Sequence, residues 1–297
     1  MFLPVWERET FCVLLRSNSQ NNYHRQTNFS SNFWSLFPMT FTTLKRTALA
    51  GASIFAFTIG SLSAQSVDDV VAKINEAGGG EKAQRAIKSM EMQLELKFNG
   101  GAVTLPVKSI KQRPAYTYSE AVFQGATFKD WYDGKNGWTI NPMQGQMNPA
   151  PKNDEELKEL EDDADMDGPF IDTKAKGYKI ELSGKEDLDG EQAYKIKVTN
   201  RHNDVKYYFV GADNYLPIKV VSKKKNKEGG EFETETYMSD YKKMPNGVVI
   251  PHSMETKMKG QTMSTMTVKS IVFDKTYDVS LFVPPAKKAD EKAEIKK

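Results

Sequence analysis

The chain has 297 residues, with 41 Lys and Arg against 39 Asp and Glu, so its formal net charge is only +2. This balance argues against a nucleic-acid partner, and a mean hydropathy of −0.58 excludes a chain built mainly of membrane-spanning helices. A single Cys excludes a disulfide framework and a cysteine-ligated metal site.

The first chain segment with a clear function is an export signal. Lys45 and Arg46 precede an uncharged, apolar run over 47–62, and small residues follow it up to Ala64. A basic start, a short apolar run and a small-residue exit are typical of a secretory signal peptide. The alternative is an uncleaved anchor, but the run is short of the ~20 apolar residues that a bilayer needs. We therefore predict a signal peptide over 39–64, cleaved after Ser63 or Ala64.

The signal begins late in the chain. Residues 1–38 are rich in Asn and Ser and contain the lone Cys12, and they end just before Met39. Our hypothesis is that Met39 is the initiator and that 1–38 are an extension outside the native protein. At the other end, 286–297 consists almost entirely of charged residues and Ala, which predicts disorder. The folded domain is expected over 65–285.

Three short helices are predicted. Apolar residues recur at helical spacing over 68–77, where Ser66 provides a cap and three glycines at 78–80 end the helix. A second helical piece covers 81–88. An acidic helix covers 154–163, with Asn153 as its cap and with Leu157 and Leu160 facing inward.

The remaining segments alternate apolar and polar residues, as half-buried strands do. The clearest example runs from Met90 to Phe98. Further strands are predicted at 103–110, 116–122, 127–132, 137–141, 178–183, 193–200, 206–210, 218–223, 231–241, 251–259 and 261–273. With about ten strands and mostly hairpin-length connections, we expect a mainly β (α+β) domain with one strongly curved or nearly closed antiparallel sheet.

Catalytic signatures are missing. The chain has no nucleophile elbow, zinc-protease motif, phosphate-binding loop or dinucleotide fingerprint. His202 and His252 are both expected at the surface. The run from Asp163 to Gly168 matches the first half of a calcium-binding loop, but its twelfth position is Lys174. The other interpretation is a solvated acidic helix end. We expect no enzyme, no cofactor and no metal.

Methionines are frequent on the predicted strands, and flexible Met side chains suit an adaptable apolar cavity. The alternative is ordinary core packing. The candidate cavity residues are Met92, Leu94, Leu96, Phe98, Trp138, Leu157, Leu160, Phe170, Met254, Met258 and Met266. A lysine run over 223–227 is interpreted as a solvated turn, with a docking patch for an acidic partner or anionic lipid as the alternative.

Three motifs in order resemble a known family. They are Lys-Gln-Arg-Pro-Ala-Tyr at 111–116, Tyr-Asp-Gly-Lys-Asn-Gly-Trp-Thr-Ile-Asn-Pro at 132–142, and Leu-Phe-Val-Pro-Pro at 281–285. This set resembles the periplasmic outer-membrane lipoprotein carriers of the LolA type, and the likeness covers about 67–286.

The resemblance implies an unclosed β-barrel whose N-terminal helix and short lid helix cover an apolar cavity. It implies a monomeric periplasmic carrier without a stable membrane span. Such a carrier takes lipoprotein acyl chains, or a similar lipid, from an inner-membrane transporter to an outer-membrane acceptor. Arg113 would be the gating arginine that hydrogen-bonds the lid backbone; the alternative is an arginine that only pairs with a surface acid.

The chain departs from this family in its acidic lid helix. Relatives with this fold also serve as envelope sensors. The alternative function is therefore a sensor or adaptor that binds a protein partner and carries no lipid.

Overall fold

The computed structural model describes residues 66–225 and 230–285. The predicted signal peptide at 39–64, the hypothetical start at Met39, the charged tail at 286–297 and part of the lysine run lie outside the described residues.

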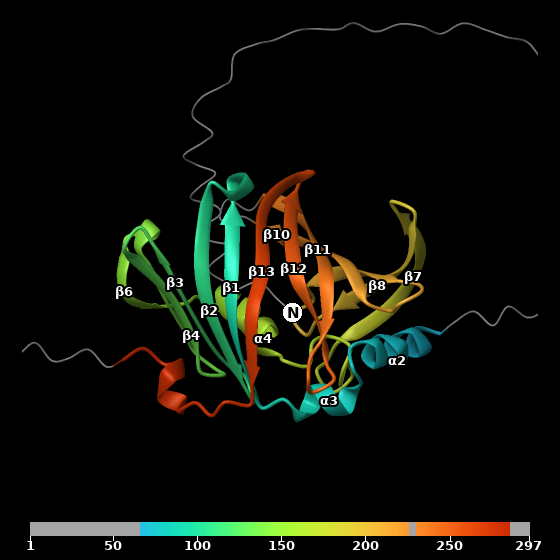
Figure 1. The fold of residues 1–297 in the computed structure, drawn as a ribbon, viewed down its shortest axis with the longest axis horizontal. Coiled ribbons are helices and arrows are strands. Elements are labelled where there is room, and N and C mark those ends of the chain that lie inside the picture. The colour runs from blue at the N-terminus through green and yellow to red at the C-terminus, as the bar shows by residue number, and fades with distance from the viewer. Residues whose placement is uncertain (1–65, 226–229, 286–297) are drawn as a thin grey trace, which may run out of the picture.

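One bent antiparallel sheet forms the body of the protein (Figure 1). In the described residues it has 13 strands in the order β6-β5-β4-β3-β2-β1-β13-β12-β11-β10-β9-β8-β7. The strands are β1 (Ser89–Phe98), β2 (Val103–Gln112), β3 (Tyr116–Phe123), β4 (Ala126–Tyr132), β5 (Gly137–Asn141), β6 (Gln146–Pro151), β7 (Lys179–Leu188), β8 (Glu191–Thr199), β9 (Val205–Gly211), β10 (Pro217–Lys225), β11 (Glu231–Lys243), β12 (Val249–Met258) and β13 (Gln261–Phe273).

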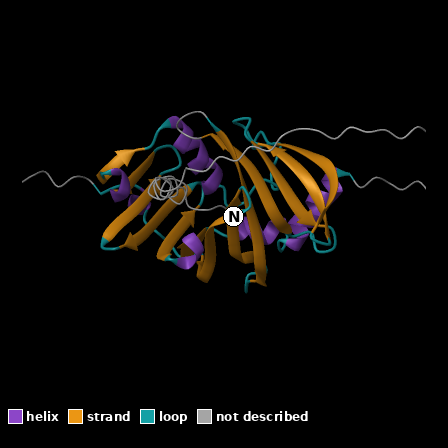
Figure 2. Cartoon of the chain, turned by 90° about the horizontal axis from the view of Figure 1, so that it is seen from above, coloured by secondary structure: helices purple, strands orange, loops and turns teal. Residues whose placement is uncertain are grey.

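The sheet confirms the predicted fold class, a mainly β domain with a strongly curved sheet. β1 pairs with β13, so the two halves of the chain run outward from the centre to the edge strands β6 and β7. The described residues show no pairing between these edges, so the barrel is not closed. Figure 2 shows the bend from above.

The strand β6 was not expected from the sequence. It contains Pro149 and Pro151, which interrupt the alternation of apolar and polar residues. Proline has no N–H to donate, but β6 is an edge strand that pairs only with β5. A strand at this position therefore tolerates both prolines.

The helices begin at the predicted caps. Helix α2 (Val67–Ala77) starts with a capping box, in which the amide of Asp69 donates to Ser66 Oγ over 3.1 Å. Helix α3 (Glu81–Ala86) follows, and α4 (Asp154–Ala164) starts with a capping box between Asn153 and Glu156. The described residues also form three 3-10 turns: η1 (Asn99–Gly101), η2 (Pro142–Gln144) and η3 (Val279–Phe282). No helix in the described ranges is both long and apolar enough to cross a bilayer.

The two faces of the sheet differ in chemistry. The inner face carries a central apolar cluster: Met92, Leu94, Leu96, Phe98, Leu105, Val107, Ala121, Phe128, Met254, Met266 and Val268. The outer face carries Lys and Glu that pair with one another, as in Lys129–Glu120 at 2.9 Å. On this outer face η3 also packs Phe282 against Tyr116, with ring centroids 5.2 Å apart.

Candidate functional site

A cavity of about 200 Å³ is lined by residues of the α2–α3 pair, of one end of the sheet and of the segment after α4. Its walls are mostly apolar: Ile74, Ile87, Met90, Met166, Pro169, Phe170, Tyr208, Leu216, Pro217, Met238, Tyr241, Val248, Val249, Ile250 and Pro251. Apolar cavities of about 150 Å³ accept benzene, so this one has room for a ring or a short alkyl segment. Several whole acyl chains require it to widen.

One wall of the cavity belongs to the lid, by which we mean α4 and the following segment 165–178. Met166 and Phe170 of the lid point apolar groups at the cavity, and Ile171 is fully buried beside them. The side-chain amide of Asn75, in α2, donates from Nδ2 to the Phe170 backbone carbonyl over 3.1 Å. The lid therefore closes directly onto the helix pair.

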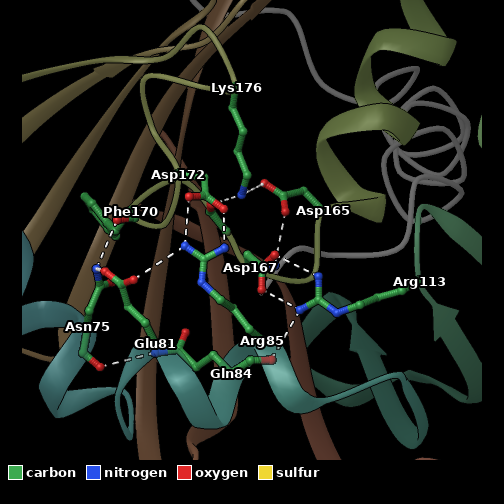
Figure 3. A network of polar contacts seen from close by, with 11 residues as sticks. Asn75, Glu81, Gln84, Arg85, Arg113, Asp165, Asp167, Phe170, Asp172 and Lys176 are labelled. Atoms are coloured by element: carbon green, nitrogen blue, oxygen red, sulfur yellow. Dashed lines mark hydrogen bonds and ion pairs between the residues drawn. The ribbon is translucent and has the colours of Figure 1, made fainter.

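Arg113, which follows β2, connects the lid to α3 (Figure 3). Its Nε donates to the Ile87 carbonyl over 2.7 Å, and Nη2 donates to the Gln84 carbonyl over 3.2 Å. Nη1 donates to Asp167 Oδ2 over 2.7 Å, and Nη2 donates to the other carboxylate oxygen. One guanidinium thus satisfies two carbonyls at the end of a helix and forks onto a lid carboxylate.

These contacts change how both partners ionise. The hydrogen bonds with Asp167 raise the pKa of Arg113 against the opposing effect of burial. Burial alone would raise the pKa of Asp167, but the hydrogen bonds and charge of Arg113 outweigh it and hold that pKa below its ordinary value. The pair is therefore charged at neutral pH.

Four other lid aspartates also contact bases, and each base comes from a different place. The pairs are Asp162 with Lys206 of β9 (3.1 Å), Asp163 with Lys111 of β2 (2.9 Å), Asp165 with Lys176 (2.6 Å), and Asp172 with Arg85 of α3 (2.8 Å). All five aspartates from Asp162 to Asp172 are thus paired with a basic side chain.

Burial of the ion pairs is graded along the lid. The side chains of Lys111 and Asp163 are both 7% exposed, whereas those of Arg85 and Asp172 are 40% and 44% exposed. Exposed pairs are screened by water and salt and contribute little. The lid is therefore held most firmly at the end of α4 and most weakly near Asp172.

The aspartates of 163–168, which match half of a calcium-binding loop, form ion pairs in the structure. Asp163, Asp165 and Asp167 each contact a different base, so their carboxylates do not converge on one point. In the part of the chain that the structure describes, no group of three His, Cys, Asp or Glu residues could hold a metal ion.

The start of α4 lies directly on β5, and Gly137 permits this approach. A Cβ at position 137 would lie 2.5 Å from Leu160 Cδ1 and 3.0 Å from Leu157 Cδ2. Below the helix, Lys152 and Asp130 form an ion pair of 2.9 Å that is almost completely buried. The second glycine of the Asp-Gly-Lys-Asn-Gly-Trp motif is thus a lid contact.

The far end of α4 contacts the other half of the sheet. Asp162 accepts hydrogen bonds from Asn200 and Tyr178, both of 3.0 Å, and Glu161 lies 2.8 Å from both Arg201 and His202. Helix α4 therefore bridges the β4–β5 side and the β8–β9 turn.

The predicted cavity residues occupy five places. Phe170 lines the cavity, and Met92, Leu94, Leu96, Phe98, Met254 and Met266 form part of the central apolar cluster. Leu157 and Leu160 pack beneath α4, whereas Trp138 packs with η3 on the outer face. Met258 lies half-buried at the end of β12. The alternation identified the buried face but not which end of it is hollow.

Other cavity residues were not singled out from the sequence. Met238 and Val248–Pro251 come from the β11–β12 hairpin, and the packing of glycine turns brings this hairpin to α2. Gly79 has φ of +103°, and a Cβ there would lie 2.4 Å from the Gly247 carbonyl oxygen. The Gly-Gly-Gly and Asn-Gly turns are the sequence signals for this contact.

The expected surface position is wrong for one of the two histidines. His252 is 7% exposed, and its Nδ1 lies 2.9 Å from the Ile250 carbonyl oxygen. It belongs to β12, whose inner face is buried, and the preceding Pro251 does not end that strand. His202 is half-buried against Glu161 of the lid.

Comparisons with known proteins agree with this fold. A family model described as "Uncharacterized protein" matches residues 116–286. No curated protein matches the chain. A solved LolA superfamily protein from Nitrosomonas europaea is 12% identical, with 71% of this chain and 96% of that chain covered and a TM-score of 0.50.

Two further solved structures are similar. A DUF1329 family protein from Desulfovibrio piger is 14% identical, with 73% of this chain and 95% of that chain covered and a TM-score of 0.47. A putative outer membrane lipoprotein-sorting protein domain from Vibrio parahaemolyticus is 12% identical, with 72% and 95% covered and a TM-score of 0.45. The chain therefore has the LolA-like fold, and it belongs to the family whose model is described as "Uncharacterized protein".

Proposed function

We propose that this chain is an exported carrier that holds the acyl chains of a lipoprotein, or of a similar lipid, beneath its lid. The observation that carries the proposal is the apolar cavity of about 200 Å³ between the helix pair, the sheet and an ion-paired lid. The LolA-like fold supports the same function, because the sequence motifs resemble those of the LolA-type lipoprotein carriers.

The energetics suit reversible capture. Each buried methylene contributes about 0.8 kcal/mol, so a few methylenes in the cavity give useful affinity without a covalent bond. Longer chains require the lid to move, and the weakly held end near Asp172 is the place where opening begins. This function needs no catalytic group and no cofactor.

The proposed location is the periplasm, and the predicted signal peptide at 39–64 supports export. By this proposal an inner-membrane transporter loads the carrier and an outer-membrane acceptor unloads it. Both steps need an open lid, so Arg113 would gate loading and release through its contacts with Gln84, Ile87 and Asp167.

Extraction of the purified mature protein tests the proposal. The protein is exported from its native gene, extracted with organic solvent and analysed by mass spectrometry, and uptake of a fluorescent fatty acid is measured in parallel. We expect bound acyl species and saturable uptake. A folded protein that yields no acyl species and takes up no probe would overturn the carrier function, and a partner protein captured by crosslinking would establish the sensor or adaptor alternative.

A further inference from the structure

We propose that Met238 and Met90 form a movable partition at the inner end of the cavity, and that this partition sets the length of acyl chain the protein holds. The inference rests on the proposed function and deepens it by naming the residues that determine specificity.

Both methionines belong to two environments at once. Met90 of β1 and Met238 of β11 line the cavity, and both also pack against the central apolar cluster. Within the described residues, no other side chain both lines the cavity and packs against this cluster. Moving them would connect the two apolar regions.

The path beyond Met238 is a row of methionines on adjacent strands. Met238 lies opposite Met254 of β12, and Met254 lies opposite Met266 of β13. Residues directly opposite one another point to the same face, so the three side chains form one line across the inner face. Met254 and Met266 are buried in the cluster and do not line the cavity.

Three residues of the cavity wall on the sheet side are stiffer than this pair. Pro217 and Pro251 have fixed backbones, and Tyr241 donates a hydrogen bond of 2.5 Å to the Pro217 carbonyl, which holds its ring in place. Methionine is unbranched and repacks readily around a new neighbour. An alkyl chain that outgrows the cavity toward the sheet would therefore displace Met238 or Met90 before it moves these three residues.

The inference predicts that affinity rises with the length of the acyl chain up to a limiting length and then levels off; we call this limiting length the break. Each methylene added inside the cavity should strengthen binding about fourfold, and the gain should stop when the chain reaches the partition. Met238→Ala removes about three side-chain atoms and should move the break to chains about three carbons longer. Met238→Phe should move it to shorter chains.

The test is a titration of the full mature protein with straight-chain fatty acids of increasing length, measured by displacement of a fluorescent fatty acid. Met90→Ala provides a second route to the same effect if a Met238 variant folds poorly. Met254→Ala is the matched control, because it lies beyond the partition and should leave the break unchanged. The double variant Met238→Ala with Met254→Ala should move the break to still longer chains than Met238→Ala alone.

Four outcomes separate the possibilities. An unchanged break in folded Met238→Ala and Met90→Ala overturns the partition, and so does an equal shift caused by Met254→Ala alone. Binding with no dependence on chain length also overturns it, while the carrier function stands. Absence of binding for every fatty acid, in a folded protein, instead overturns the proposed function.

Discussion

Replacing Arg113 with Met tests whether one guanidinium holds the lid closed. The substitution keeps an unbranched apolar stem and removes every donor. It leaves the carbonyls of Gln84 and Ile87 without this partner, and it leaves Asp167 without its forked ion pair. The lid keeps the ion pairs of Asp162, Asp163, Asp165 and Asp172.

The expected effect is intermediate in size. The side chains of Arg113 and Asp167 are 28% and 11% exposed, so water reaches the site only in part. Breaking a fully buried ion pair costs about 3–5 kcal/mol, whereas an exposed pair contributes about 1 kcal/mol or less. We therefore expect Arg113→Met to destabilise the closed lid, relative to the open lid, by about 2–3 kcal/mol. This change raises the population of the open lid about 30- to 150-fold.

Native-state hydrogen exchange measures this opening. The backbone amides of Lys176 and Tyr178 donate to the backbone carbonyls of Asp172 and Thr173 within the lid, so they exchange when the opened segment loosens. Their exchange should accelerate about 30- to 150-fold while β1 stays protected. The matched control is Lys129→Met, which removes an ion pair on the outer face of β4 and should leave lid exchange unchanged. Equal protection of the lid in both variants would refute the assignment of Arg113 as its fastener.

Three further predictions concern the lid and its supports. Gly137→Ala should destabilise the protein by about 1–3 kcal/mol in denaturant unfolding, because the new Cβ meets Leu160; adding Leu160→Ala should cost less than the sum of the single changes, and strict additivity would contradict the packing. Lys152→Met should cost about 3–5 kcal/mol because it leaves Asp130 buried and unpaired, whereas adding Asp130→Leu should recover most of it; no recovery would show that the charges are not the cause. The pKa of Asp167 lies below its ordinary value of 3.8, so the open lid binds more protons than the closed lid. Lid protection against exchange should therefore be flat near neutral pH and fall as the pH drops below about 4, and a loss centred near pH 6 would contradict this.

The strands were predictable because their cause is local. In β1 the alternation of Met92, Leu94 and Leu96 with charged and polar residues is visible in the sequence, and it fixes one buried face. Strand β6 escaped because Pro149 and Pro151 break the pattern, and only its edge position makes them tolerable. That position depends on the whole sheet, so no local pattern contains it.

The site was predictable only in part, because its contacts join distant segments. Arg113 was singled out as a gating residue, and the structure places it between α3 and the lid. Its carboxylate partner Asp167 lies 54 positions away in the sequence, and no periodicity links the two. Likewise, Met90 and Met238 meet at one cavity only because the sheet closes β1 onto β13 and then β12 and β11.

The acidic lid is compatible with a carrier because it separates closing from ligand binding. A greasy lid would cover the cavity by burying its own apolar face, and would thereby compete with the cargo for the same surface. Here the ion pairs of Asp163, Asp167 and Asp172 hold the segment closed, and the apolar groups that the lid presents to the cavity are Met166, Pro169 and Phe170. The stability of the closed state can therefore change with the ion pairs while the affinity for acyl chains is set by the apolar lining.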